Sequence, residues 1–273
     1  MGVAPVLWST AGVVTRHVES AAPFELVFWR SLFAFLCVGV VLRRNPFGGG
    51  WPLLLSGAMW GVMFTTFMLA LSLTSTANTL VVMSLSPLLT TLLSSLFLKD
   101  PIGPSTWAAA GAAALGIGWM FGSDLSAHGA RDFAGMAIAL TVPFAAAINV
   151  VTLRAAGARV DLLPAVMLGG AVSCLVALPL ALPFQASARD LGLLAFLGVF
   201  QLALPCLLLV LASRALLAPE IALLGLLEVV LGPLWAWLGA GEVPARATLA
   251  GGAIVLAALA LNELSVALSL RRR

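Results

Sequence analysis

The chain has 273 residues, of which 62% are hydrophobic and only 9% are charged, against about 45 to 50% and about 25% in soluble domains. Its 14 Lys and Arg and 11 Asp and Glu residues cannot supply a water-soluble surface, about a quarter to a third of which is normally charged. A soluble globule is therefore excluded. The net charge of +3 does not indicate nucleic acid, because the basic residues are scattered singly between apolar runs.

Apolar runs separated by short polar, glycine- or proline-containing breaks predict an all-α integral membrane protein with ten transmembrane helices. Barrel strands are not expected, because the runs lack an alternating pattern. The first run is short for a full crossing, so we expect a short or N-terminally truncated helix rather than a cleaved signal peptide. The predicted segments are 2–16, 24–42, 51–73, 76–98, 105–122, 133–153, 162–183, 191–213, 216–239 and 247–268.

The basic residues give an orientation. With these segments, nine Lys and Arg residues fall on one side of the membrane and four on the other, and Arg30 lies inside a segment. Cytoplasmic loops carry the excess of positive charge. Both termini are therefore expected in the cytoplasm, in a multi-pass protein of the plasma (inner) membrane. The bias favours an even number of helices and leaves eight as the alternative to ten.

Features of the two halves match at an offset of 142 residues, on either side of the polar stretch 123–132. Asp100 aligns with Glu242, and each acidic residue closes the fourth apolar segment of its half. Because each half has five segments, the second copy would lie inverted, as in many secondary transporters. The predicted units are a first repeat at 1–122, a second at 133–268 and a basic cytoplasmic tail at 269–273.

Several short motifs resemble the EamA-type branch of the drug/metabolite transporter superfamily. They are Leu7-Trp8-Ser9-Thr10-Ala11-Gly12, Trp29-Arg30-Ser31-Leu32, Ser86-Pro87-Leu88-Leu89 through Lys99-Asp100-Pro101, and Leu227-Glu228-Val229 through Gly232-Pro233 to Gly241-Glu242. The resemblance implies ten helices, cytoplasmic termini, a central cavity and transport of small metabolites, often outward. One departure is Val229, where many relatives have proline, so a hinge there would move to Pro233.

Two charges are expected deep in the membrane. Glu228 lies near the middle of the ninth segment, where an ionised side chain costs about 2.5 to 3.5 kcal/mol on insertion scales. It is interpreted as a substrate-ammonium or proton-coupling site, or as a structural residue bonded to a neighbouring helix. Arg30 lies at a compatible depth. The two side chains would pair directly or hold the two ends of a zwitterionic substrate; otherwise Arg30 snorkels outward or binds a carbonyl.

Further candidates for the cavity are aromatic, amide and hydroxyl side chains. Trp8, Trp29 and Trp60 lie away from the helix ends, where a ring can stack on a ligand or serve as packing. Asn149 and Gln201 can bond a ligand or another helix. Ser86 is the first-half counterpart of Glu228. Prolines inside apolar segments predict kinks or hinges; they are Pro87, Pro143, Pro205 and Pro233.

Small residues indicate where helices approach closely. The spacing of Gly57 and Gly61 predicts one contact face on the third segment, and Gly118 and Gly122 predict another on the fifth. We expect the fifth and tenth segments to pack together as a scaffold. A homodimer contact is the alternative.

The leading hypothesis is a secondary active transporter that exports a small metabolite such as an amino acid or drug-like compound. Alternating access around the cavity would be coupled to protons or exchange, because no nucleotide-binding motif occurs. No cofactor or metal site is expected. A membrane-embedded enzyme is the first alternative, although only one deep carboxylate is found, and a structural or receptor membrane protein is the second.

Overall fold

The structure is a computed structural model that describes residues 2–42, 50–127, 130–155, 162–212 and 218–271. All regular secondary structure in these ranges is helical. The α-helices are α1 (Val3–Trp8), α2 (Ala11–Thr15), α3 (Pro23–Val41), α4 (Gly50–Leu73), α5 (Thr76–Met83), α6 (Ser86–Leu98), α7 (Pro104–Ala127), α8 (Ala130–Ala155), α9 (Leu162–Ala181), α10 (Ala188–Phe196), α11 (Leu204–Ala212), α12 (Ala218–Ala240) and α13 (Arg246–Arg271). A π-helix, η1 (Leu197–Ala203), joins α10 to α11.

Helix occupies most of every predicted apolar segment that the structure describes, with ends shifted by a few residues. The largest shift is around the polar stretch 123–132, because α7 continues to Ala127 and α8 begins at Ala130. The predicted tail is also partly helical, since α13 runs to Arg271. Residues 272–273 of that tail lie outside the described residues.

Within the described ranges, seven helical segments are long and apolar enough to cross a membrane. Two shorter apolar helices, Val3–Thr15 and Leu224–Ala240, accompany them. The chain is therefore a multi-pass helical membrane protein. The number of ten crossings stays a prediction.

The central helix α4 packs against α8 and α9, and α9 also packs against α3. Gly57 and Gly61 make the α4–α9 contact close: a Cβ added at Gly57 would lie 2.6 Å from Leu168, and one at Gly61 would lie 2.6 Å from Val172. The predicted close approach at this GxxxG spacing is confirmed, and α9 is the partner helix.

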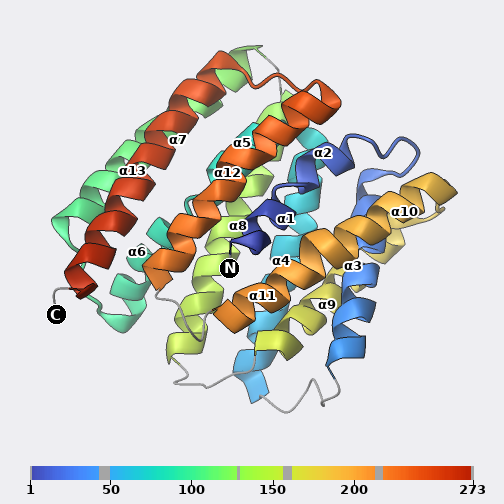
Figure 1. Cartoon of the computed structure of the whole chain (residues 1–273), viewed down its shortest axis with the longest axis horizontal. Coiled ribbons are helices and arrows are strands. Elements are labelled where there is room, and N and C mark those ends of the chain that lie inside the picture. Colours follow the sequence, from blue (N-terminus) through green and yellow to red (C-terminus); the bar gives the residue numbers. More distant parts are fainter. Residues whose placement is uncertain (1, 43–49, 128–129, 156–161, 213–217, 272–273) are drawn as a thin grey trace.

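Helices α7 and α13 pack side by side along one edge of the bundle (Figure 1). The pairing expected from their small residues is confirmed, but the contact predicted at Gly118 and Gly122 is wrong. A Cβ on Gly116 would lie 2.7 Å from the Gly251 carbonyl oxygen, whereas one on Gly118 or Gly122 would meet nothing within 4 Å. The seam therefore runs through Gly116 and Gly251. The homodimer alternative stays a prediction.

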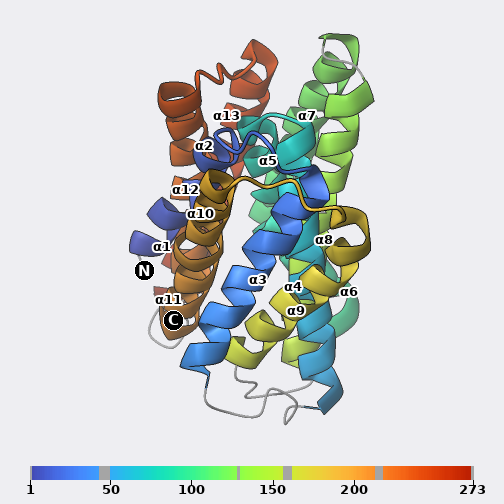
Figure 2. The ribbon, with the colours of Figure 1, turned by 90° about the vertical axis from the view of Figure 1, so that its right-hand side faces the viewer.

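Buried carboxylates fix the connections at one end of the bundle. Glu25, at the start of α3, accepts the backbone N–H groups of Gln185 and Ala186. Asp190, in the first turn of α10, accepts those of Glu19 and Ser20. In Figure 2 this end of the bundle, which also contains α2, lies at the top. The last turns of α3 and the first turns of α4 lie at the bottom.

Candidate central cavity

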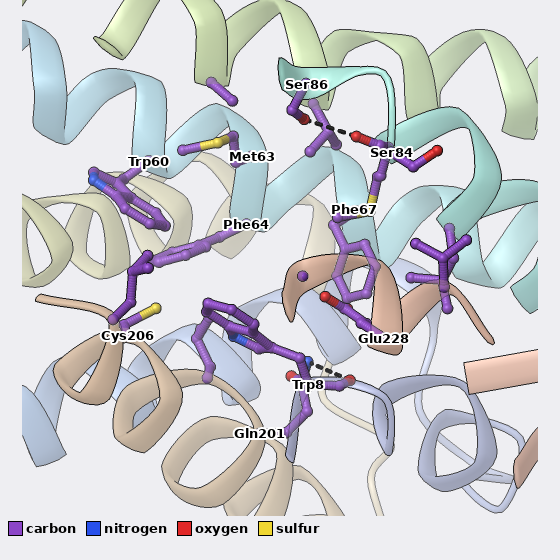
Figure 3. Close-up of a pocket in the computed structure, with 18 of the residues that line it drawn as sticks. Trp8, Trp60, Met63, Phe64, Phe67, Ser84, Ser86, Gln201, Cys206 and Glu228 are labelled. Carbon is purple, nitrogen blue, oxygen red and sulfur yellow. Dashed lines mark hydrogen bonds between the residues drawn. The ribbon is translucent and has the colours of Figure 1, made fainter. Parts of the chain in front are cut away.

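A cavity of about 330 Å³ lies between the helices of both halves of the chain. Most of its wall is apolar or aromatic, and a few polar side chains interrupt it (Figure 3). Six of the eight candidate side chains line this cavity: Trp8, Arg30, Trp60, Ser86, Gln201 and Glu228. Residues up to 220 positions apart in the sequence, Trp8 and Glu228, thus converge on one site.

Arg30 is buried in the cavity wall on α3, with 2% of its surface exposed. Its Nε and Nη2 atoms both donate to Gln201 Oε1, at 3.1 and 2.9 Å, and Nη1 donates to the Phe64 carbonyl at 3.5 Å. The guanidinium carbon lies 5.3 Å from the Phe67 ring centroid and 6.0 Å from that of Phe64. Neutral oxygens and ring faces therefore offset the cost of burying this charge.

The direct Arg30–Glu228 ion pair considered from the sequence is not formed. Within the described part of the chain, the ion pairs are made by Arg16, Arg154 and Arg189. Arg30 does not snorkel outward either; it binds an amide oxygen and a carbonyl, which was one of the alternatives. Glu228, on α12, faces the same cavity and accepts no hydrogen bond from the other described residues. The site thus holds one acidic and one basic group that do not neutralise each other by contact.

The π-helix η1 positions Gln201. A π-helical turn contains more residues than an α-helical turn, and such turns are frequent at functional sites. Gln201 is 1% exposed, and its Nε2 donates to the Trp8 carbonyl at 3.3 Å. One amide therefore connects the cation on α3 to the end of α1.

Trp8 lies where the first apolar segment divides into α1 and α2. The Ser9 and Thr10 hydroxyls donate to the carbonyls of Val6 and Leu7, both at 2.7 Å. These local bonds compete with the regular helical ladder. The break leaves the Trp8 carbonyl able to accept from Gln201.

A second break, between α5 and α6, brings Ser86 and Pro87 to the cavity. Proline has no N–H, so the carbonyl four residues earlier, that of Met83, loses its usual helical donor. The Ser86 hydroxyl donates to this carbonyl at 2.7 Å. Pro87 therefore marks a real interruption of the fourth apolar segment, and Ser86 satisfies the group that the interruption frees.

Other predicted residues lie elsewhere. Asn149 is buried on α8 but does not line the cavity. Trp29 packs against Phe184, and its Nε1 donates to Glu25 at 3.2 Å, away from the cavity. Of the other prolines, Pro143 and Pro233 lie inside continuous helices α8 and α12, and Pro205 follows η1 at the start of α11.

Sequence reasoning did not identify the apolar lining. Phe64, Phe67 and Met63 on α4, Met83 on α5 and Cys206 on α11 all reach the cavity. Their residue types are equally common on lipid-facing surfaces, so the sequence contains no signal that separates the two positions. The only partial signal is the Gly57–Gly61 spacing, which fixes which face of α4 contacts α9.

Comparisons with known proteins give a consistent result. Residues 1–122 match the EamA-like transporter family. The pseudopaline exporter CntI, from two strains of Pseudomonas aeruginosa, UCBPP-PA14 and PAO1, is 28% identical over 270 residues, covering 96% of this chain and 94% of the exporter. One solved crystal structure has a TM-score of 0.65 at 19% identity and covers 96% of this chain and 94% of that chain, which shows a shared fold.

Proposed function

We propose, on the premise that the chain is an EamA-type member of the drug/metabolite transporter superfamily, that it is a secondary active exporter of a small zwitterionic or cationic metabolite. The observation that carries the proposal is the cavity, in which Arg30 and Glu228 face one space without forming an ion pair. CntI, the relative of similar length, is named as a pseudopaline exporter.

Two binding roles follow from the geometry. Glu228 receives the ammonium group of the substrate, because its carboxylate faces the cavity and none of the residues that the structure describes donates to it. Arg30 faces the negatively charged group of a zwitterionic substrate. Trp8, Trp60 and Phe67 enclose the apolar part of the substrate between its charged groups. An ammonium group over these rings gains cation–π attraction in addition to the charge–charge term.

The proposed architecture is two inverted five-helix repeats that form ten spans. Contacts between helices support it. Where a helix of one half packs against a helix of the other, the corresponding helices of the two halves also pack against each other. For example, α4 packs on α8, and the equivalent helices η1 and α11 pack on α1. Ser31 and Ser173, which are 142 residues apart, donate and accept one hydrogen bond of 2.9 Å. A two-fold axis passing between equivalent residues brings them together in this way.

The orientation follows from the basic residues. The charge bias supports an orientation with both termini in the cytoplasm, in a chain that we propose lies in the inner membrane. The end that carries Asp100 is then cytoplasmic, and the end that carries Glu242 is outside. Energy comes from a proton gradient or from exchange of a second solute, with Glu228 as the group that carries either a proton or the substrate ammonium.

Transport by purified protein in liposomes tests the proposal. The solutes to compare are amino acids, polyamines, cationic dyes and pseudopaline, each with and without a pH gradient. We expect flux of at least one zwitterionic or cationic solute, and at least a tenfold loss of that flux in Glu228→Gln, because the amide cannot carry the negative charge. Glu228→Asp should retain part of the flux.

Glu263 provides a matched control. It is a buried glutamate of a membrane helix, like Glu228 in charge and size, but it lies on α13, outside the cavity, beside Asn262. Glu263→Gln should transport like the unmodified protein. Full activity of both Glu228→Gln and Glu228→Asp would refute the role of Glu228, and absence of flux for every solute under every gradient would refute the transport function.

A further inference from the structure

Two ion pairs lie at opposite ends of the bundle, outside the cavity. The first joins Arg16, at the end of α2, to Glu242, just after α12, with 2.6 Å between Nε and Oε2. The second joins Arg154, at the end of α8, to Asp100, just after α6, with 2.8 Å between Nη2 and Oδ2. In Figure 1, α2 lies toward the top of the bundle and α6 toward the bottom.

The turns that carry the two acidic residues are built alike. Lys99 and Gly241, which are 142 positions apart, both adopt the left-handed conformation, with φ of 59° and 67°. The residue after each is the acid, whose N–H donates to the carbonyl six positions earlier: Asp100 to Ser94 and Glu242 to Ala236. These acceptors are again 142 positions apart. The left-handed conformation is sterically unfavourable for Lys99. The two halves therefore share this turn even where the residue is not glycine.

The basic partners also correspond. Arg16 ends the first apolar segment of the first half, and Arg154 ends the first apolar segment of the second half, one helical turn from the position equivalent to Arg16. Each ion pair therefore connects the first segment of one half to the fourth segment of the other half. Residues of the same four segments, among them Trp8, Ser86, Val142 and Glu228, line the cavity between the two pairs.

The two pairs differ in how firmly they are held. The Arg16 and Glu242 side chains are 29% and 16% exposed, whereas those of Arg154 and Asp100 are 51% and 40% exposed. Arg16 also donates to the carbonyls of Leu71 and Thr74 at the end of α4. Glu242 also accepts the N–H and hydroxyl of Thr76 at the start of α5. Among the residues that the structure describes, the second pair is supported by one additional side-chain bond, from Arg154 to the Ser94 hydroxyl.

We propose that Arg16–Glu242 and Arg154–Asp100 are reciprocal gates, each of which must separate for the cavity to open at its own end. The inference rests on the proposed transport function and adds the residues that control access. The Arg16–Glu242 gate, tied to four helical segments, holds its end closed. The Arg154–Asp100 gate, exposed and tied to two helices, opens more readily, so the cavity is accessible preferentially from the Asp100 end.

Cysteine accessibility tests the gates without requiring a substrate. Cys37, Cys174 and Cys206 are first replaced by alanine. Leu80→Cys then supplies a reporter between the Glu242 gate and the cavity, because Leu80 lines the cavity one turn after Thr76. A membrane-impermeant methanethiosulfonate is added to the Glu242 side of sealed vesicles of known orientation, and the labelling rate is measured.

We expect Glu242→Gln to raise the labelling rate of this reporter at least fivefold. Asp100→Asn should lower it, because opening the other end favours the state closed at the Glu242 end. Glu242→Asp should give a rate near that of the parent. Glu19→Gln is the matched control: Glu19 pairs with Arg189 at the same end, at 2.9 Å, but both side chains are exposed and neither lines the cavity. Glu19→Gln should not change the labelling rate of the reporter.

Unchanged labelling in Glu242→Gln, in protein that elutes as a monodisperse species and labels fully after denaturation, would overturn the gate assignment. An equal increase in Glu19→Gln would overturn it as well, because any lost surface charge would then suffice. Failure of the transport proposal is distinguishable: it appears as absent flux in the unmodified protein and leaves the labelling comparison between variants intact.

Discussion

Gln201 provides the sharpest test of how the protein tolerates a buried cation. Replacing it with leucine removes the oxygen that accepts both Arg30 Nε and Nη2, at 3.1 and 2.9 Å, and keeps a side chain of similar volume. Interhelical hydrogen bonds in membrane proteins contribute about 0.6 kcal/mol on average and at most about 1.7 kcal/mol. Because the donor here is charged and 2% exposed, each bond belongs at the upper limit, which gives about 3 kcal/mol for the two.

Thermal unfolding in detergent measures this loss. For a protein of this size, about 1 kcal/mol corresponds to roughly 2 to 4 °C in Tm, so Gln201→Leu should lower Tm by roughly 6 to 12 °C. Gln201→Glu should unfold near the parent temperature, because a carboxylate accepts the same two bonds, and its charge attraction to Arg30 offsets the lost bond from Nε2 to the Trp8 carbonyl. A Gln201→Leu protein within about 1 °C of the parent would refute the view that Gln201 holds the guanidinium.

Three further experiments test other parts of the structure. Gly116→Ala should destabilise by about 1 to 3 kcal/mol through overpacking against the backbone of α13, whereas Gly118→Ala on the same helix should be neutral or stabilising by up to about 1 kcal/mol; equal Tm values would reject the revised seam. Glu25→Gln should cost about 1.5 to 3 kcal/mol, because it removes charged acceptors from buried N–H groups, measured by the same unfolding assay. Phe67→Leu should cost about 0.5 to 2 kcal/mol through loss of the ring beneath Arg30, in addition to the packing cost of a smaller buried side chain; in an Arg30→Met background only the packing cost should remain.

The helices could be predicted closely because hydropathy determines where a chain can cross lipid. The 24–42 segment, for example, differs from α3 by one residue at each end. The divisions of the first and fourth segments were not predicted as breaks, although Pro87 was identified as a hinge. They depend on local hydroxyl bonds, such as that of Ser86, which a hydropathy pattern does not register.

The charged members of the site were predictable for the same reason. Arg30 and Glu228 interrupt long apolar runs, and an ionisable side chain in lipid marks a functional site. Their partners were not predictable: nothing in the sequence indicates that Arg30 prefers Gln201 to Glu228. The choice depends on the π-helical turn at η1, and therefore on backbone geometry that the composition of the segment does not encode. The seam through Gly116 rather than Gly118 depends in the same way on helix rotation.

The π-helix η1 makes the site sensitive to chain length as well as to residue type. A helix advances about 100° per residue, so one residue deleted before Gln201, with the π-helical turn of η1 retained, would rotate everything on one side of the deletion by about that angle. Arg30 would then face a different side chain even though every lining residue was still present. Insertions and deletions between residues 197 and 200 can consequently change what the cavity recognises in a way that no substitution can reproduce.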